Sequence, residues 1–292
     1  MSEAVEPGTS TGTGYDLAVS PARAFALITQ AEELRHWFAQ DVEIDASLGG
    51  QFRFAGRGAY VPVATVLERF EADHLIAWRW PVHGVDVMVT LTITPKDDPQ
   101  TCRIDVACTI PNTLPIPRGR ELIDDIWRFQ LANLKTYSEG GEGVFLPDYS
   151  DPTPEVRQTI LISAPQPTVF RTLLDPELLK QWCSGDAVVD PRVGGQYKFG
   201  WNYEVDGKQV AGGPTRIIEL IENERLVTDW PDWRGDESNA GQTITWLLAD
   251  EGEGTSLTLT HNGFARTADV SDYPFGWAWF ASEIKRVAEG AG

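Results

Sequence analysis

Two stretches of alternating hydrophobic residues stand out in the first half of the chain. One stretch carries Val85, Val87, Val89, Leu91 and Ile93, and the other carries Cys102, Ile104, Val106, Cys108 and Ile110. Between them, Asp97-Asp98-Pro99 is typical of a turn. Because side chains alternate between the two faces of a strand, the pattern predicts neighbouring antiparallel strands with one apolar and one polar face.

The second half shows the same alternation. Tyr197, Phe199, Trp201, Tyr203 and Val205 share one parity, so we expect them on the aromatic face of a single strand over 197–205. Shorter strands are expected at 15–19 and 156–162, near the start of each half. Each of these is followed by Ser20-Pro21 or Ala164-Pro165, which predicts the start of a helix, and by a second short helix that ends at Trp37 or Trp182.

A helical spacing of apolar residues closes each half. The first set is Ile123, Ile126, Trp127, Gln130, Leu131 and Leu134, and the second is Trp277, Phe280, Ile284 and Val287. This spacing predicts two helices that each bury one face. An antiparallel sheet of about six strands with an apolar face needs a cover, so we expect an α+β fold in which each sheet wraps around one long C-terminal helix.

The chain also repeats itself. When 170–199 is placed on 25–54, ten of the thirty positions are identical without a gap. The identities include Trp37 with Trp182 and the Gly-Gly pairs at 49–50 and 194–195. These glycines lack the context of a phosphate-binding loop, so we interpret them as turns or bulges at the entry to a strand. The repeat predicts two copies of one domain in tandem.

The composition of the chain suggests where these domains begin and end. Residues 1–14 are rich in Gly, Ser and Thr and are predicted to be a disordered tail. The first domain is expected over 15–140 and the second over 155–290. The Gly- and Pro-rich segment 141–154 between them is predicted to be a linker.

The motifs of the second half resemble those of a known family. They are Ala164-Pro165, Trp182, Asp190, Gly194-Gly195, Gly254-Thr255 leading through Leu257 and Leu259 to His261-Asn-Gly-Phe264, and Gly276-Trp277. The order of elements resembles the helix-grip fold of the START and birch-pollen-allergen (SRPBCC) superfamily. The motifs resemble its family named after the activator of heat-shock-protein-90 ATPase. That superfamily includes lipid carriers, hormone receptors, cyclases and chaperone cofactors, so the resemblance implies a fold and not one function.

The two halves match this pattern unequally. The first half keeps Trp37, Asp45 and Gly49-Gly50 but lacks the His-Asn-Gly-Phe and Gly-Trp elements, and it has a Pro-rich segment at 109–117 in their place. We therefore interpret the first domain as the divergent copy, used for packing or regulation.

The charge and composition of the chain indicate which binding partners and which location to expect. The net charge is −19 and is shared by both halves, with 12 basic and 21 acidic residues before position 149. A nucleic-acid partner is not expected, because phosphate backbones require a basic surface. No apolar run approaches the length of a membrane span, and the N-terminus does not resemble a secretory signal, so a cytoplasmic location is expected.

The cysteines and histidines indicate neither disulfides nor a metal. Cys102 and Cys108 lie six residues apart in one predicted strand, too far from each other to be bridged, and Cys183 is left without a pair. The four histidines, at 36, 74, 83 and 261, lack zinc-type spacing. We predict no metal and no cofactor.

The second half holds the candidate site. Its aromatic residues either line an apolar cavity between sheet and helix or form a filled core, and the sequence leaves both open. They are Tyr197, Phe199, Trp201, Tyr203, Trp230, Trp246, Trp277 and Phe280. His261 shares parity with Leu257 and Leu259, so it is expected to point toward this cavity or its rim. There it either binds a polar group of a ligand or moves a proton, or else it forms a structural hydrogen bond that fixes the following loop.

Three functions fit these observations. The leading hypothesis is binding of a small hydrophobic ligand, mainly in the second domain. An alternative is a cyclase- or aldolase-like enzyme in which His261 and a tyrosine act as acid and base. The third is an interaction module that regulates a chaperone or associates with itself through its acidic surfaces. The catalytic residues of such an enzyme are unknown.

Overall fold

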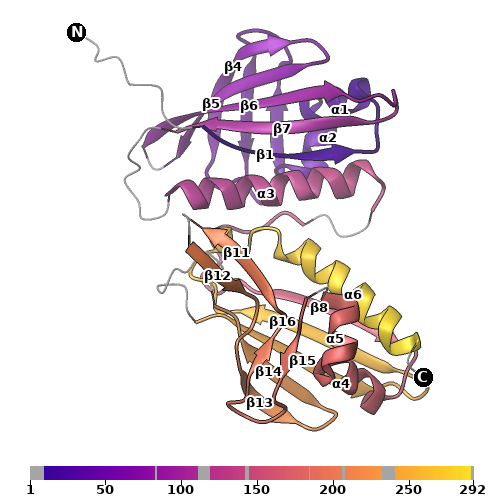
Figure 1. The fold of residues 1–292 in the computed structure, drawn as a ribbon. Coiled ribbons are helices and arrows are strands. Elements are labelled where there is room, and N and C mark those ends of the chain that lie inside the picture. Colours follow the sequence, from indigo (N-terminus) through magenta and orange to yellow (C-terminus); the bar gives the residue numbers. More distant parts are fainter. Residues whose placement is uncertain are drawn as a thin grey trace. The chain divides into compact units, whose positions relative to one another are not determined.

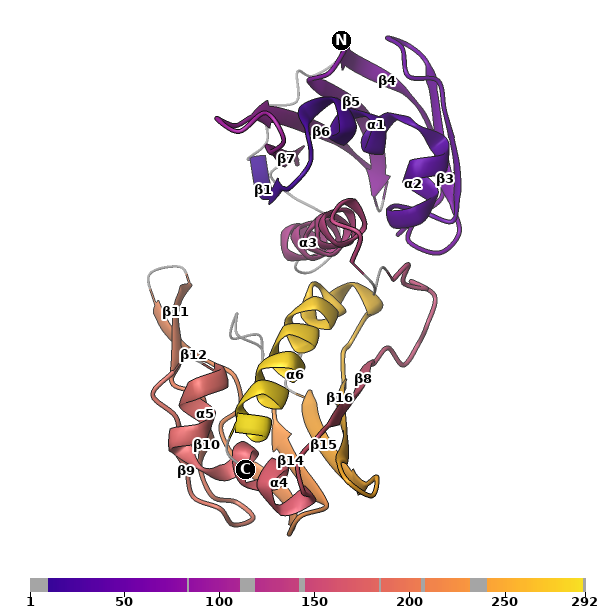
Figure 2. The same ribbon diagram turned by 90° about the vertical axis from the view of Figure 1, so that its right-hand side faces the viewer.

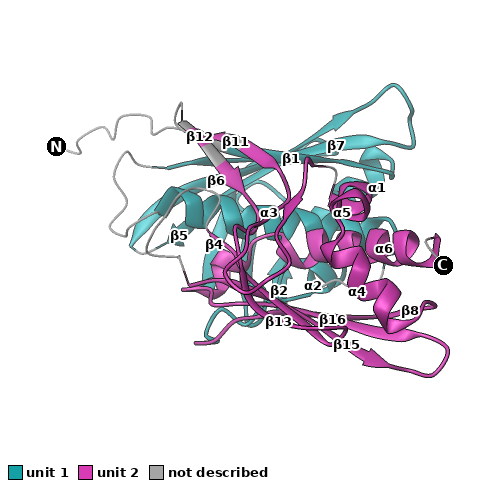
Figure 3. Cartoon of the chain, turned by 60° about the horizontal axis from the view of Figure 1, so that its bottom comes forward, with its two compact units in different colours: residues 1–151 teal, residues 152–292 magenta. Residues whose placement is uncertain are grey.

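The computed structural model describes residues 10–82, 84–110, 119–141, 145–183, 185–205, 208–231 and 241–290. The chain divides into two compact units, Met1–Asp151 and Pro152–Gly292, which we call the first and second domains (Figure 3). The boundary falls inside the predicted linker 141–154. Each domain is an α+β unit with antiparallel strands and a long C-terminal helix, as the sequence predicted.

The described part of the first domain contains one sheet and three α-helices, whose arrangement is drawn in Figure 1. Its elements are β1 (Ser10–Leu17), α1 (Pro21–Thr29), α2 (Ala31–Trp37), β2 (Asp41–Ile44), β3 (Gln51–Ala55), β4 (Val63–Glu71), β5 (Leu75–Val82), β6 (Val85–Pro95), β7 (Cys102–Thr109) and α3 (Gly119–Ser138). The seven strands form one antiparallel sheet in the order β1-β7-β6-β5-β4-β3-β2. The sheet therefore has one strand more than the sequence predicted.

The sheet curves around α3, which lies along its concave side (Figure 2). The predicted alternation on β6 and β7 is confirmed, because Val87, Val89 and Leu91 are buried and so are Ile104 and Val106. All six apolar-face residues predicted for α3 are also buried. Burial of the apolar face of the sheet and of the apolar face of α3 against each other therefore holds the helix against the sheet.

A buried tryptophan joins the two short helices of each domain, and in the first domain α1 also has a side-chain cap. The hydroxyl of Ser20 caps α1 by accepting a hydrogen bond from the Arg23 amide. Trp37, at the end of α2, is fully buried and donates from Nε1 to the Leu27 carbonyl at 3.0 Å. Its counterpart Trp182 donates to the Thr172 carbonyl at the same distance. The repeated tryptophan thus joins the two helices of each domain.

The Gly-Gly pairs form tight turns before a strand, as predicted. The first glycine of each pair has a positive φ, 79° at both Gly49 and Gly194, which favours glycine. The second approaches a backbone oxygen so closely that a Cβ would lie 2.1 Å from it, namely that of Asp45 at Gly50 and of Asp190 at Gly195. Both glycines are therefore required by geometry, for different reasons.

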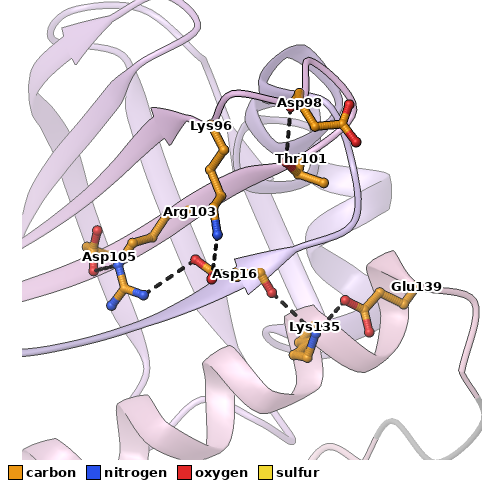
Figure 4. Close-up of polar contacts among 8 residues, drawn as sticks. All are labelled: Asp16, Lys96, Asp98, Thr101, Arg103, Asp105, Lys135 and Glu139. Atoms are coloured by element: carbon orange, nitrogen blue, oxygen red, sulfur yellow. Dashed lines mark hydrogen bonds and ion pairs between the residues drawn. The ribbon is translucent and has the colours of Figure 1, made fainter.

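Polar contacts fasten the edge strand β1 of the first domain (Figure 4). Asp16 accepts a hydrogen bond from Lys96 at 2.7 Å and lies 3.5 Å from Arg103, while its backbone oxygen accepts from Lys135 of α3. The hydrogen bond from Lys96 lowers the pKa of Asp16. These side chains are exposed, so each pair contributes little stability.

The second domain has a divided sheet. Its elements are β8 (Val156–Ile162), α4 (Gln166–Leu174), α5 (Pro176–Cys183), β9 (Val188–Val189), β10 (Tyr197–Lys198), β11 (Trp201–Val205), β12 (Lys208–Gly212), β13 (Ile217–Ile221), β14 (Arg225–Asp229), β15 (Thr243–Asp250), β16 (Thr255–Asn262), the 3₁₀ helix η2 (Thr267–Val270) and α6 (Tyr273–Gly290). Five strands form a sheet in the order β13-β14-β15-β16-β8, while β9 pairs with β10 and β11 with β12. In Figure 2, α6 lies between β8 and β16 on one side and the β11–β12 hairpin on the other.

Two predictions about local structure are wrong. The strand expected over 197–205 is interrupted at Gly200, whose φ of 82° breaks the ladder into β10 and β11. Residues 10–14, expected in the disordered tail, belong to β1, where they pair with β7 from Thr109 to Asp105. A run of small polar residues can pair as an edge strand because the partner strand supplies the backbone hydrogen bonds.

The three cysteines, Cys102, Cys108 and Cys183, are free and buried, as expected from their spacing. Within the described part of the chain, no helix is both long and apolar enough to cross a membrane. The Pro-rich segment noted in the sequence at 109–117 lies outside the described residues from position 111 onward.

Candidate functional site

His261 lies at the centre of the candidate site in the second domain. It is the seventh residue of β16, pairs with Ile244 of β15 and Val156 of β8, and is completely buried. Its Nε2 is 2.8 Å from Oε1 of Gln242, and its Nδ1 is 3.1 Å from the indole Nε1 of Trp277 on α6. The histidine therefore connects the sheet to the C-terminal helix.

These partners determine the protonation state of the imidazole. An indole nitrogen can only donate, so Nδ1 of His261 must be the acceptor from Trp277. The proton then resides on Nε2, which donates to the amide oxygen of Gln242. Burial lowers the pKa of His261 well below its ordinary value, which favours the same neutral form.

An aromatic shell surrounds His261. The ring centroids of Phe264, Tyr273 and Trp230 lie 4.4, 4.6 and 5.4 Å from that of the imidazole. Trp230 donates from Nε1 to the Tyr273 hydroxyl at 3.1 Å. The indole N–H of Trp230 and the hydroxyl of Tyr273 are thus hydrogen-bonded to each other within the shell, as is typical of a well-packed polar network.

The arrangement disfavours an acid–base role for His261. Both ring nitrogens are occupied and the side chain is completely buried, so a substrate has no direct access to either nitrogen. The structural hydrogen bond considered from the sequence is present, although it reaches Gln242 and Trp277 and not the following loop. That loop is instead fixed by Gly263, where a Cβ would lie 2.3 Å from the Gly241 oxygen.

The structure brings most of the predicted aromatic residues together in a packed cluster. Tyr197, Phe199, Trp230, Trp246 and Trp277 are buried. Tyr197 donates to the Leu173 carbonyl, and burial raises the pKa of its hydroxyl well above the ordinary value. Trp246 contacts both Trp182 and Trp277. These five residues therefore form core and not the surface of an open cavity. Tyr203 belongs to β11, and its side chain lies outside the described part of the structure.

Two of the predicted residues are partly exposed. Trp201 and Phe280 are stacked with centroids 5.6 Å apart and an interplanar angle of 27°. Trp201 also contacts the buried Phe199 and donates from Nε1 to the Cys183 carbonyl at 2.8 Å. The pair thus places a partly exposed aromatic surface next to the buried cluster.

Sequence reasoning missed three residues of this site. Gln242 accepts a hydrogen bond from His261, and the Tyr273 hydroxyl accepts one from Trp230. The backbone oxygen of Cys183 accepts one from Trp201. The many tryptophans of the sequence were a general signal, because a buried indole N–H usually finds a hydrogen-bond acceptor. The sequence does not show which residue supplies it.

No cluster of three or more His, Cys, Asp or Glu side chains suited to a metal occurs among the residues that the structure describes. Asp229, in a segment rich in acidic residues, accepts hydrogen bonds from the Thr215 and Arg216 amides, so its oxygens are engaged within the fold.

Comparison with known proteins identifies the family. The model of the family described as activator of Hsp90 ATPase homolog 1-like protein matches residues 18–139 and 163–289. The chain belongs to this family. Both copies of the repeat are thus members of it, including the divergent first one. A search of curated proteins found no match.

Several solved structures are similar to this chain at low sequence identity. DynU16, from the dynemicin biosynthetic locus, is 15% identical, covers 98% of this chain and 96% of its own, and has a TM-score of 0.42. The Aha1 dimer from Colwellia psychrerythraea is 22% identical over 48% of this chain and 99% of its own, with a TM-score of 0.39. The di-domain ARO/CYC BexL of the BE-7585A pathway is 13% identical over 97% and 98%, with a TM-score of 0.38. Because all three TM-scores are below 0.5, these similarities give no information about the function of this chain.

The neutral state of His261 predicts that the second domain loses stability in acid. The pKa of His261 is far lower in the folded state than the value of about 6.5 expected in the unfolded state. As the pH falls below about 6.5, the unfolded state therefore binds a proton that the folded state does not. The free energy of unfolding should fall by about 1.4 kcal/mol per pH unit until the folded pKa is reached.

Urea denaturation of the wild type and of His261→Gln between pH 7.5 and 5.5 measures this loss. The glutamine variant has no titrating group at this position, so the difference between the two proteins isolates the histidine. Parallel pH dependences of the two proteins would contradict the prediction.

Proposed function

We propose that the second domain binds a small hydrophobic molecule and that a planar part of this molecule lies against Trp201 and Phe280. The observation that supports the proposal is the partly exposed stack of these two rings at the division of the sheet. An apolar patch that stays accessible on the surface of a folded domain marks an interaction or ligand-binding site.

Trp201 is held in place before any ligand arrives. Its indole donates to Cys183, and the Gly213 backbone lies so close that a Cβ there would be 3.4 Å from the Trp201 ring and 3.1 Å from Phe199. Gly200 sets the course of the chain immediately before it. A ring that is fixed in advance loses little conformational entropy on binding, which favours affinity.

Binding without catalysis fits the polar groups of the domain better than the alternatives. The cyclase- or aldolase-like enzyme requires a histidine that can exchange a proton, whereas both nitrogens of His261 are hydrogen-bonded. The chaperone-regulating module follows from the name of the family and from the net charge of −19, and it predicts a complex that weakens with salt. A cytoplasmic location remains part of the proposal.

Titration with the uncharged fluorescent probe N-phenyl-1-naphthylamine tests the site. We expect Trp201→Ala and Phe280→Ala each to weaken binding about tenfold, because a ring contact of this kind contributes about 1.4 kcal/mol. Phe145→Ala is the matched control, since Phe145 is an aromatic residue of the first domain that is 44% exposed. Equal affinities of all four proteins, or no binding to the wild type, would refute the proposal.

A further inference from the structure

A cleft opens at the surface of the second domain, between α4 and the turn that joins β13 to β14. Its volume is about 570 Å³, within the range of about 300–1,000 Å³ that is usual for small-molecule sites. The apolar part of its wall consists of Pro167, Phe170, Leu174, Pro191 and Leu220. No described residue of α6 and neither ring of the stack proposed above as a ligand site lies in this wall, so the two sites are separate.

In the first domain an aromatic side chain occupies the corresponding place. Phe25 aligns with Phe170 in the repeat, and Phe70 corresponds to Leu220, because each lies three residues before a turn residue with a φ of 61°. The rings of Phe25 and Phe70 pack edge to face with their centroids 5.7 Å apart. The smaller leucine of the second domain therefore leaves room beside the Phe170 ring.

Hydrogen bonds hold the walls of the cleft together. Nε2 of Gln166, at the start of α4, donates to the Asn223 carbonyl in the turn at 2.6 Å. The loop before β10 is joined to β13, because the Gly194 amide donates to the Ile217 carbonyl at 2.8 Å and the Ile217 amide donates to the Gly195 carbonyl at 3.0 Å. The shape of the cleft is therefore preformed, which lowers the entropic cost of binding.

Two side chains of opposite charge line the cleft. Arg171 lies on α4 and Glu222 lies in the turn, so the two charges come from different elements. Both side chains are exposed, and neither forms a hydrogen bond or ion pair with any residue that the structure describes. By contrast, Arg225 and Glu219 of the same hairpin form an ion pair at 3.1 Å. The cleft thus offers one cationic and one anionic group to a ligand.

We infer that this cleft binds an apolar α-amino acid in its zwitterionic form. The carboxylate of the ligand accepts hydrogen bonds from Arg171, and its ammonium group donates to Glu222. Its side chain covers Phe170, Leu174 and Leu220. A ligand with only one charge satisfies one of the two charged groups and leaves the other unpaired.

L-Phenylalanine is the probe for this inference, and two matched compounds, 3-phenylpropionate and 2-phenylethylamine, each lack one of its charges. Backbone amide signals of the full-length protein are followed in ¹H–¹⁵N correlation spectra at neutral pH. We expect L-phenylalanine to shift the signals of residues 166–174 and 220–224 with a Kd of about 1 mM, because the two ion pairs are exposed and each contributes little. Each matched compound should bind about fivefold more weakly, which is the effect of losing one such ion pair.

Three variants test the contacts of the ligand. Arg171→Met removes the charge and keeps an apolar stem, so it should weaken binding of L-phenylalanine about fivefold and leave that of 2-phenylethylamine unchanged. Arg157→Met removes an exposed arginine of β8 outside the cleft and is the control for the change in net charge. Leu220→Phe places in the cleft the side chain that Phe70 has in the first domain, and it should abolish binding.

The inference is overturned if no saturable shifts occur around the cleft or if all three compounds bind equally well. Equal affinity of Arg171→Met and Arg157→Met for L-phenylalanine would also overturn it. Trp201→Ala should bind L-phenylalanine like the wild type, whereas shifts that depend on Trp201 would overturn the inference and support the site at Trp201 and Phe280. If Leu220→Phe does not fold, the comparison of the three compounds on the wild type decides.

Discussion

Replacing His261 by alanine is expected to lower the free energy of unfolding of the second domain by about 3–5 kcal/mol. The substitution removes a fully buried ring that contacts Phe264, Tyr273 and Trp230. It also leaves the indole N–H of Trp277 and the amide oxygen of Gln242 without the partner that each has in the wild type. A cavity and two unpaired polar groups arise together, so the effect should exceed that of removing apolar atoms alone.

Hydrogen exchange followed by mass spectrometry locates the effect. Protection should fall in β15, β16 and α6, because these elements are joined through His261, and remain unchanged in the first domain. His74→Ala is the control, since His74 is an exposed histidine of the first domain whose Nδ1 lies 2.9 Å from the Ile93 carbonyl, and loss of this one contact should cost about 1 kcal/mol. If His261→Ala is as stable as the control, His261 does not hold the sheet to the helix.

The sequence predicted the elements that depend on strong local patterns. The alternation on β6 and β7 and the helical spacing on α3 were both confirmed, because burial of one face determines each of these segments. The repeat aligned Trp37 with Trp182, and the structure shows that the two residues form the same hydrogen bond. Such features are visible in the sequence because the residues concerned lie close together along the chain.

Features that depend on distant residues could not be predicted. The aromatic alternation over 197–205 gave no sign that Gly200 interrupts the strand, because the close approach involves the Asp186 backbone of a preceding loop. The partners of His261 lie 19 and 16 residues away. The ring of Trp127 on α3 likewise contacts Trp78 and Trp80 on β5, two elements that are far apart in the sequence.

The family motifs of the second domain have a structural task. The sequence favoured the second domain as the binding domain because it keeps the motifs of the family. Two residues of those motifs, Trp277 and His261, form a hydrogen bond with each other inside the core. In the first domain, Cys108 stands at the strand position that His261 has in the second.

Gly200→Ala is expected to destabilise the second domain by about 3–5 kcal/mol, whereas Gly194→Ala should cost about 1–2 kcal/mol. Both glycines have a positive φ, 82° at Gly200 and 79° at Gly194, so an alanine is strained at either position. They differ in the surroundings of the added Cβ, which would lie 2.6 Å from the Asp186 backbone at Gly200 and more than 4 Å from any neighbour at Gly194. Urea denaturation measures the free energy of unfolding of both variants. The loss in Gly194→Ala gives the cost of the positive φ alone, and the additional loss in Gly200→Ala gives the cost of the clash.

The same pair of variants tests how the ligand site is built. Gly200 directly precedes Trp201, so relief of the clash must move β11 away from Asp186 and weaken the hydrogen bond from Trp201 to the Cys183 carbonyl. Gly200→Ala should therefore weaken binding of N-phenyl-1-naphthylamine about as much as Trp201→Ala does, while Gly194→Ala should bind it like the wild type. Equal destabilisation by the two glycine variants would show that conformational strain alone governs both positions. Unchanged binding by a folded Gly200→Ala would show that the division of the sheet does not position Trp201.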